Sequence, residues 1–525
     1  MSTTFEGLYI AKSGVQAARS SLNITGQNIS NVNTAGYTRQ RVDQSAIPPS
    51  AGKMLYASSG ALSGEGVAAT GVSQLRNTFL DAQYRTQGAK CGASSALLDG
   101  MDSIEQILNE STTDGISAQL GNLLTQLQGM TSNGGGTATE STVRNAASLL
   151  TTFFNIAAHN IDATQQKQLG YLQDHAVGQA NILMRDIASL NQQIKSANIA
   201  GTPALELTDQ RNAMIDELSQ YMNIRVSEVD NGGVSVKGQP VTDLEISLVD
   251  GDGKTVRSLV SNDRYVQLKV ETLPPDATYP YGKATVQINK MADPDTYTDL
   301  PDSQFVSGEI HGYLQFLNES GEFDGTATRG VGYYKQVLDE TARKFAELMN
   351  KANSTNDAQD NAPLFAASDG GAAGITAANI TIAPGWESDG KGYLRTTRET
   401  GNAGDDNSAG TDNIEYMIRL LEGSDAVTIE ANGKSVFTGS MQGAVDDISL
   451  KLGQDIGSLA SQSEADASTL NNIDAGRQEI SSVDINEEAI SLIQYNQALA
   501  ASARFMTTAD EVLDTIINNM GLAGR

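Results

Sequence analysis

Histidine and cysteine, the side chains on which metal binding and nucleophilic catalysis most often depend, are nearly absent from this chain. It contains one cysteine, Cys91, and three histidines, His159, His175 and His311. One cysteine cannot form an intrachain disulfide, and the scattered histidines lack the spacing of a zinc site or a Ser/His/Asp set. Cys91 stands among small residues of an expected helix, which favours a packed thiol over a nucleophile. We therefore predict no catalytic residues, no metal site and no cofactor.

One acidic loop has the beginning of a calcium-binding motif. Asp250, Asp252 and Gly253 fit the first positions of such a loop, but Lys254 stands at the fifth position. The twelfth position, where calcium loops carry a bidentate carboxylate, is Ser261. We therefore predict a β-turn here.

The remaining polar features are also better explained as structure. The glycines at 64–66 and 134–136 lack the strand-then-helix context of a phosphate-binding loop. We expect the acidic pairs at 405–406 and 446–447 to face water. Trp386 lies between proline and glycine, and we expect it to anchor a loop, with carbohydrate stacking as a less favoured alternative.

Length and charge narrow the class of protein further. At 525 residues the chain is too long for one core and should form three or more domains. It carries 63 acidic and 35 basic residues, a net charge of -28, so we expect no nucleic-acid binding and no membrane insertion. The N-terminus lacks a basic region followed by an apolar stretch, so we expect no cleaved secretory signal. A chain that stays in the cytoplasm and a chain exported with its N-terminus intact would both show this feature.

Both ends of the chain carry apolar residues at a spacing of seven. This period predicts helices whose seams face partner helices, as in a coiled coil. The N-terminal stripe contains Leu8, Val15, Leu22 and Ile29, and the C-terminal stripe contains Ile485, Leu492, Leu499, Met506, Leu513 and Met520.

The two terminal helices differ in their intrinsic stability. Gly7, Gly14 and Gly26 interrupt the first, and each costs an isolated helix roughly 1 kcal/mol relative to alanine. We expect this segment to become helical only against a partner. The segment 484–520 contains neither glycine nor proline and would span roughly 55 Å as a helix.

Between the stripes, the apolar period changes twice. Helical spacing is expected at 78–108 and in a long helix whose second half covers 169–197. The stretch 33–71 is rich in turn residues and predicts an extended loop. From 223 the pattern alternates, with a hairpin turn at Asn231-Gly232. Further strands are expected at 244–249, 265–270, 284–288, 375–382 and 427–437, a helix at 333–352, and helix again from 441.

A polar segment follows the first stripe directly. Asparagine and threonine favour helix caps and turns, and glycine can supply a positive φ, so the segment should end the helix at a defined place. Its signature positions are Asn28, Asn31, Asn33, Thr34, Gly36 and Tyr37.

The stripe and this segment together resemble the axial proteins of the bacterial flagellum, the rod, hook and hook-associated proteins. Their N-terminal helix ends in N-x-x-N-x-N-T-x-G-[FY], and every signature position is present here. The C-terminal stretches 483–488 and 508–513 also resemble the terminal helix of that family. The internal segment 207–219 resembles a stretch of the hook-associated members that join the hook to the filament. The resemblance is thin across the alternating middle.

The resemblance implies a multidomain α+β fold, with terminal helices that form a coiled-coil-like bundle or rod and β-rich insertions in the middle. We expect a terminal inner-tube domain from 1–45 and 481–525. An elongated bundle should comprise 46–222 and 441–480, with the helix at 330–353 packed on it, and β-rich outer domains should comprise 223–329 and 354–440.

The resemblance also implies a structural, non-enzymatic role in the flagellum, at the junction of hook and filament. Its implied partners are further copies of the chain, the hook protein, a second junction protein (hook-associated protein 3) and an export chaperone. The protein would be secreted by the flagellar type III apparatus and lie outside the cell. Two alternatives stay open: a hook or rod protein, and an axial protein whose outer domain binds a ligand as an adhesin does.

Overall fold

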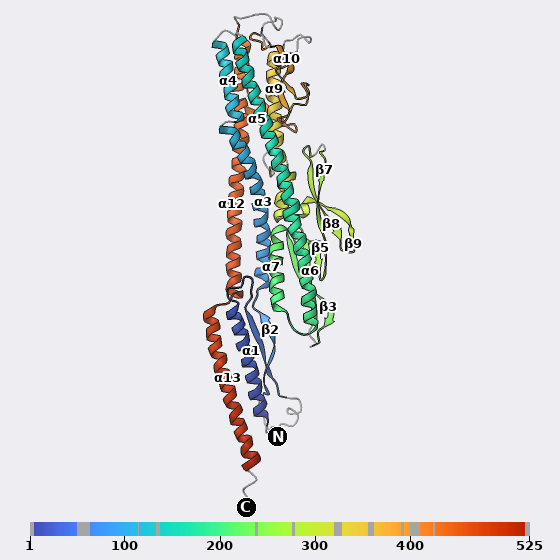
Figure 1. Ribbon diagram of the computed structural model, residues 1–525, viewed down its shortest axis with the longest axis vertical. Coiled ribbons are helices and arrows are strands. Elements are labelled where there is room, and N and C mark those ends of the chain that lie inside the picture. The colour runs from blue at the N-terminus through green and yellow to red at the C-terminus, as the bar shows by residue number, and fades with distance from the viewer. Residues whose placement is uncertain are drawn as a thin grey trace, which may run out of the picture.

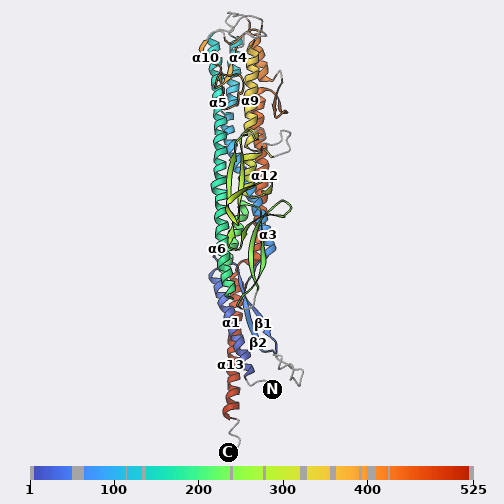
Figure 2. The same cartoon turned by 90° about the vertical axis from the view of Figure 1, so that its right-hand side faces the viewer.

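Long helices run side by side along most of the molecule and give it the shape of a rod (Figures 1 and 2). Both chain termini lie at the same end. The structure is a computed structural model that describes residues 5–49, 64–113, 115–132, 137–236, 240–275, 279–319, 328–354, 362–389, 393–398, 410–423 and 426–519.

The rod is built from amphipathic helices with a shared apolar core. On α4, for example, Leu120, Leu123 and Leu127 are buried at three- and four-residue spacing. The long helix predicted through 169–197 is confirmed, although a π-helical turn interrupts it. The helices of the rod are α3 (Thr78–Thr113), α4 (Ile116–Ser132), α5 (Thr137–Gly170), the π-helix η1 (Tyr171–Val177), α6 (Gly178–Ile199), α7 (Leu205–Tyr221), α8 (Glu309–Asn318), α9 (Val331–Asn353), α11 (Asp412–Glu422) and α12 (Met441–Ser481).

Two antiparallel sheets lie beside the lower half of the rod (Figure 1). The first has the order β3-β4-β5-β6 and comprises Ile224–Val234, Pro240–Val249, Thr255–Ser261 and Arg264–Tyr265. The second, β7-β8-β9, comprises Leu268–Leu273, Lys283–Lys290 and Asp293–Leu300. Two short hairpins, a 3-10 turn and a short helix complete the middle of the chain: β10 (Phe365–Ala367) with β11 (Ile380–Ile382), β12 (Val427–Ala431) with β13 (Lys434–Gly439), η2 (Asp302–Gln304) and α10 (Pro384–Asp389).

The hairpin turn predicted at Asn231-Gly232 is wrong. Strand β3 continues through these residues, and its pairing with β4 shifts register between Asp230 and Gly233. Gly232 has φ +72°, which a β-bulge can use as readily as a turn. By contrast, β12 and β13 are joined by a tight turn, with Asn432 at φ 51° and Gly433 at φ 73°.

The loop predicted at 33–71 is also wrong over most of its described part. Strands β1 (Gln40–Ile47) and β2 (Gly66–Gln74) pair there as an antiparallel hairpin that lies along α1 (Glu6–Ser30). The hairpin was missed because its residues are mostly small or polar and their burial does not alternate along the strands. The Val67 amide donates to Ser13 Oγ at 3.1 Å, which joins the hairpin to the helix.

The terminal helices form an antiparallel pair below the rod (Figure 1). Helix α12 ends at Ser481, and α13 (Ile485–Asp514) begins after three intervening residues, with the Asp484 carboxylate accepting from the Asn486 amide. A π-helical segment η3 (Thr515–Asn519) follows. In the part of the chain that the structure describes, no helix combines the length and apolar character needed to cross a membrane.

One glycine of α1, Gly14, lies where α1 and α13 come close together. A Cβ added to Gly14 would lie 2.7 Å from Ser502 Oγ of α13, whereas one added to Gly26 would meet nothing within 4 Å. Gly14 therefore allows the close approach of the two helices. The fold class expected from the sequence, helical termini and a helical rod with a β-rich middle, is confirmed.

Candidate assembly site at the foot of the rod

The two terminal stripes meet in the pair α1–α13, but they are buried to different extents. All four members of the N-terminal stripe are half-buried, and the small row beside them, Ala11, Ala18 and Thr25, is buried instead. On α13, Leu513 is buried and Leu499 and Met506 are half-buried. Ile485 and Leu492 are exposed. Met520 lies outside the described residues.

Helix α13 presents several large apolar residues to solvent. One of them, Phe505, lies at the edge of the contact with α1, because a Cβ added to Gly7 would lie 3.8 Å from its ring. Phe505 and Val512, seven residues apart, are 48% and 54% exposed. Ile490 and Ile493 are each 56% exposed. We call these four residues the outer face of α13. Large exposed apolar surfaces on a soluble protein mark interaction sites. The sequence pattern did not single out these residues, because they fall outside the seven-residue stripe.

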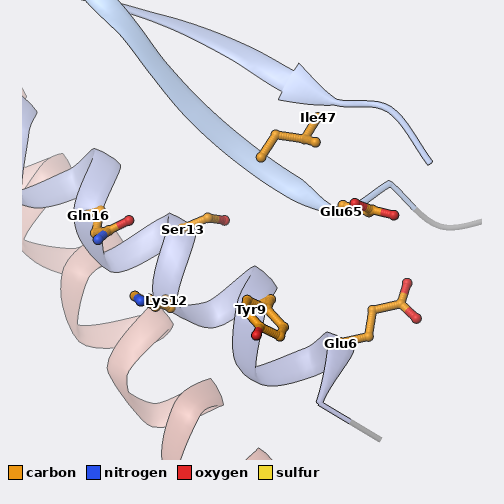
Figure 3. A pocket seen from close by; sticks show the side chains of 7 residues that line it. All are labelled: Glu6, Tyr9, Lys12, Ser13, Gln16, Ile47 and Glu65. Carbon is orange, nitrogen blue, oxygen red and sulfur yellow. The ribbon is translucent and has the colours of Figure 1, made fainter. Parts of the chain in front are cut away.

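A groove lies between α1 and the loop end of the β1–β2 hairpin (Figure 3). It measures about 380 Å³ and is open to solvent. Tyr9 on its wall is 67% exposed. The pair α1–α13 thus keeps accessible surface on both helices. The groove is lined by Glu6, Tyr9, Lys12, Ser13, Gln16, Ile47 and Glu65.

Asn28, the first signature residue of the motif, is the centre of a hydrogen-bond cluster. It is 1% exposed. Its Nδ2 donates to the Gln40 carbonyl at 2.9 Å and to Glu488 Oε2 at 3.2 Å. Its Oδ1 accepts from the Gln40 amide at 3.1 Å and from the Tyr37 hydroxyl at 2.9 Å. This one side chain therefore connects α1 to β1 and to α13. Only a side-chain amide supplies the two N–H donors and the carbonyl acceptor that these bonds need.

The other motif residues shape the turn that leaves α1. Asn31 Nδ2 donates to the Gln27 carbonyl at 3.0 Å, and the Thr34 hydroxyl donates to Asn31 Oδ1 at 3.2 Å. Gly36 has φ +77°, which favours glycine. Asn33 is exposed. The motif therefore combines one buried connector, Asn28, with residues that direct the chain into β1.

Arg39, just past the signature positions, connects the same turn to the break between α12 and α13. Its Nε donates to Glu488 Oε1 at 2.7 Å and its Nη1 to Glu487 Oε2 at 2.6 Å. Its backbone amide donates to the Ser481 carbonyl at 2.9 Å. Arg39 thereby fixes the position at which the last helix turns away from the rod.

The internal segment 207–219 supplies α7 with two buried acids, of which Asp209 faces this turn. Asp209 Oδ2 accepts from the Thr38 amide at 3.0 Å, and Oδ1 accepts from the Thr38 hydroxyl at 2.6 Å. Burial raises the pKa of Asp209 above its ordinary value, and the bonds from Thr38 and the charge of Arg76 oppose that shift. The segment thus holds the end of the α1 turn against the rod.

The second acid, Asp216, begins a ladder of ion pairs across three helices of the rod. It accepts from Arg85 Nε of α3 and from Arg477 Nη1 of α12, each at 2.7 Å. Arg477 also lies 3.6 Å from Asp81, which pairs with Arg76 at 3.0 Å. Arg76 lies 3.7 Å from Asp209 and so completes the connection to the motif. We call the residues joined by these hydrogen bonds and ion pairs the foot cluster. It comprises Asn28, Tyr37, Thr38, Arg39, Gln40, Arg76, Asp81, Arg85, Asp209, Asp216, Arg477 and Glu488.

The remaining sequence candidates lie elsewhere and do not come together. The three histidines lie on α5, η1 and α8. Burial raises the pKa of the half-buried Cys91 thiol, and Asp466 acts in the same direction, which agrees with a packed thiol. Within the described ranges, no three potential metal ligands cluster.

Trp386 and the acidic turn have structural roles. Trp386 is 1% exposed, and its Nε1 donates to Glu140 Oε1 at 3.3 Å, so the prediction of an anchor is confirmed and carbohydrate stacking is excluded. Asp250 Oδ1 accepts from the amides of Asp252 and Lys254 at 3.0 and 2.8 Å. The predicted β-turn is confirmed.

Family models match three parts of the chain. The model described as the flagellar hook-associated protein FlgK helical domain matches residues 101–365, which is half of the chain. The flagella basal body rod protein model matches residues 8–38, and the flagellar basal body rod FlgEFG protein C-terminal model matches residues 474–520. The central match favours the hook-associated proteins over the hook or rod alternative, because the terminal matches are shared with rod proteins.

Individual proteins agree with this assignment. The chain is 28% identical over 540 residues to flagellar hook-associated protein 1 of Bacillus subtilis (strain 168), covering 100% of both chains. It is 26% identical over 435 residues to the protein of the same name from Escherichia coli (strain K12), covering 82% of this chain and 71% of that protein. The solved flagellar hook junction protein FlgK from Burkholderia pseudomallei has the same fold, with a TM-score of 0.57 at 15% identity over 77% of this chain and 100% of that one.

Proposed function

Since the chain belongs to the family of the flagellar hook-associated protein FlgK, we propose that it joins hook to filament through its paired terminal helices, packed against those of neighbouring copies. The chain is a structural component of the bacterial flagellum. The proposal gives it a structural role and no catalytic one. Its self-association would use the ends of the chain, where both terminal stripes lie.

The outer face of α13 is the observation that carries this proposal. Its four apolar side chains are about half exposed although α13 packs on α1, and only Phe505 lies at the edge of that contact. Burying a large apolar side chain contributes roughly 1.5–3 kcal/mol, so a ring of copies would gain several such contributions per subunit. A neighbouring copy would supply a cover of matching chemistry, since Tyr9 of α1 and Phe5, just before that helix, are exposed.

The foot cluster supports the second part of the proposal, that the rod keeps a fixed direction relative to the terminal pair. The chain passes between them twice, from β2 into α3 and from α12 into α13. Asn28 and Arg39 bind the end of α1 and the segment after it to the start of α13, and Asp209 binds that segment to α7. A load applied to the rod would therefore reach the terminal helices through these bonds.

We extend this arrangement to the three parts expected from the sequence. The terminal domain (1–45 and 481–525) would form the inner tube, and the rod (46–222 and 441–480, with 330–353) would form a second layer. The β-rich parts (223–329 and 354–440) would face outward. The position of the two larger sheets beside the rod supports this order (Figure 1).

The proposed partners follow from the same surfaces. Further copies of the chain would pack laterally, with the hook protein on one side of the ring and hook-associated protein 3, the second junction protein, on the other. An export chaperone would cover the outer face of α13 before assembly. We propose export by the flagellar type III apparatus, without a cleaved signal, to a site outside the cell.

The test replaces apolar residues of the outer face with charge. We expect Ile493→Asp combined with Val512→Asp to leave hooks without filaments in a strain that lacks the native gene. The matched control is Leu450→Asp on α12, an apolar residue that is 60% exposed but lies on the rod. Filaments of normal number in the double variant, at normal levels of secreted protein, would refute packing through the outer face.

A further inference from the structure

Arg211 of α7 is a buried cation without a carboxylate partner. It is 8% exposed, and its Nη1 donates to Asn191 Oδ1 at 3.1 Å. Its Nε is buried and has no hydrogen-bond acceptor among the described residues. None of the described carboxylates forms an ion pair with it, in contrast to Arg85 and Arg477 on the same side of the rod. Burying an unpaired guanidinium is costly, because the charge loses its hydration without compensation.

Arg211 lines a pocket of about 160 Å³ enclosed by α6, α7 and the strands β3 and β4. One buried water needs only roughly 10–15 Å³ measured in this way, so the pocket has room for a small polyatomic group. The lining is mostly polar. It includes Asn191, Lys195, Thr208, Arg211, Glu228 and Thr242.

The pocket is lined by a larger share of basic side chains than the chain has as a whole. Arg211 and Lys195 line it with one carboxylate, Glu228, whereas the chain carries a net charge of -28. Lys195 pairs with Asp243 at 2.8 Å, so Arg211 is the cation whose hydrogen-bonding capacity is unused. Burial lowers the pKa of Arg211, and the charge of Glu228 opposes that shift. A guanidinium presents parallel N–H groups that match the two oxygens of a carboxylate or phosphate.

We propose that this pocket binds a small oxyanion, of the size of a phosphate or a single carboxylate, through the guanidinium of Arg211. The ligand would accept from the N–H groups at the end of the guanidinium that Asn191 leaves free. Because the pocket joins α6, α7 and the β3-β4-β5-β6 sheet, a bound anion would link three elements at the lower part of the rod (Figure 1).

The experiment must distinguish an external anion from Glu228 as the counter-ion of Arg211. It is exposed on β3, and its carboxylate accepts from the Thr242 hydroxyl at 3.5 Å. If Glu228 were the built-in counter-ion of Arg211, its removal would destabilise the protein. If the pocket takes an external anion, removal of a negative charge from its wall would strengthen binding.

The experiment measures the thermal unfolding midpoint of the full chain in sodium chloride, sodium phosphate and sodium acetate at equal ionic strength and pH. We expect phosphate or acetate to raise the midpoint of the wild type above its value in chloride, and the two salts distinguish a tetrahedral from a planar oxyanion. In Arg211→Gln, the affinity obtained from the salt titration should fall roughly 10–100-fold. In Glu228→Gln it should rise. Arg257→Gln, which removes an exposed arginine from β5, should respond as the wild type does.

The proposal fails if the wild type responds equally to all three salts, or if Arg211→Gln retains the response. It also fails if Glu228→Gln is less stable in chloride and gains nothing from the other anions. Should Arg211→Gln not fold, the opposite expectations for Glu228→Gln still decide between an external and an internal counter-ion.

Discussion

The amide of Asn28 donates a hydrogen bond to the carboxylate of Glu488 at 3.2 Å, across 460 residues of sequence. The bond is buried and joins the end of the first helix to the beginning of the last. It makes the terminal pair and the exit into β1 a single unit, because the same side chain also binds the backbone of Gln40.

Replacing Asn28 by Asp should disrupt this unit. The new carboxylate would face Glu488 and could no longer donate to it or to the Gln40 carbonyl, so we expect loss of filament growth in a complementation assay. Asn33→Asp makes the same chemical change at an exposed position of the motif and should leave motility intact. Equal motility of the two variants would show that the Asn28 cluster is dispensable.

Removing the carboxylate of Asp216 should destabilise the rod by about 3–5 kcal/mol, because Arg85 and Arg477 would lose the acceptor that both share. Urea unfolding of the purified chain measures the change. The control is Asp186→Ala, which breaks an ion pair with Arg185 whose side chains are 38% and 57% exposed. Its expected cost is much smaller, because solvent screens an exposed ion pair. A cost for Asp216→Ala no larger than that of the control would contradict the buried ladder.

A large side chain at Gly14 should separate the terminal helices, because even a Cβ there lies 2.7 Å from Ser502 Oγ. We therefore expect Gly14→Leu to abolish incorporation into flagella. Gly26→Leu has no neighbour within 4 Å of its Cβ and should be incorporated normally. Immunoblots of purified hook-filament structures give the readout, and incorporation of both variants would argue against close pairing of α1 and α13.

The free energy of unfolding should fall at high pH, because the Tyr37 hydroxyl loses its proton there. Burial raises the pKa of its hydroxyl to about 12, and Glu206, Asp209 and Glu488 act in the same direction. The folded state therefore holds the phenol proton more tightly than the unfolded state, whose pKa is near 10. This contribution is fully present below about pH 10 and is lost as the pH rises through about 12. The difference in unfolding free energy between wild type and Tyr37→Phe should shrink over that window, and a constant difference would contradict it.

Limited proteolysis of the purified, unassembled chain tests whether the terminal helices are ordered before assembly. From their narrow stripes and the glycines of the first, we expect cleavage before Asn33 and after Ile480, with the rod resistant. Assembled flagella should protect both segments. Protection in the isolated chain would mean that the foot cluster alone orders the terminal helices.

The seven-residue stripes and the motif were readable in the sequence because both repeat a local pattern. The sequence did not show which row of α1 is buried, because the close approach of α13 at Gly14 places the small row Ala11, Ala18 and Thr25 deepest. The role of Asn28 was equally hidden, since its partner Glu488 lies 460 residues away in sequence. The β1–β2 hairpin was missed because it is stabilised by contacts to α1 more than by an apolar pattern of its own.

The π-helical turn η1 changes the phase of the longest helix of the rod. Above it, Asn155 of α5 donates to the carbonyls of Ala377 and Ile380. Below it, Asn181 of α6 exchanges two hydrogen bonds with the backbone of Leu268. A π turn contains an additional residue relative to an α turn, so it rotates one half of the helix relative to the other. Deleting a single residue within 171–177 would turn α6 by about 100° and point its polar contacts away from the sheet, while α5 kept its own neighbours.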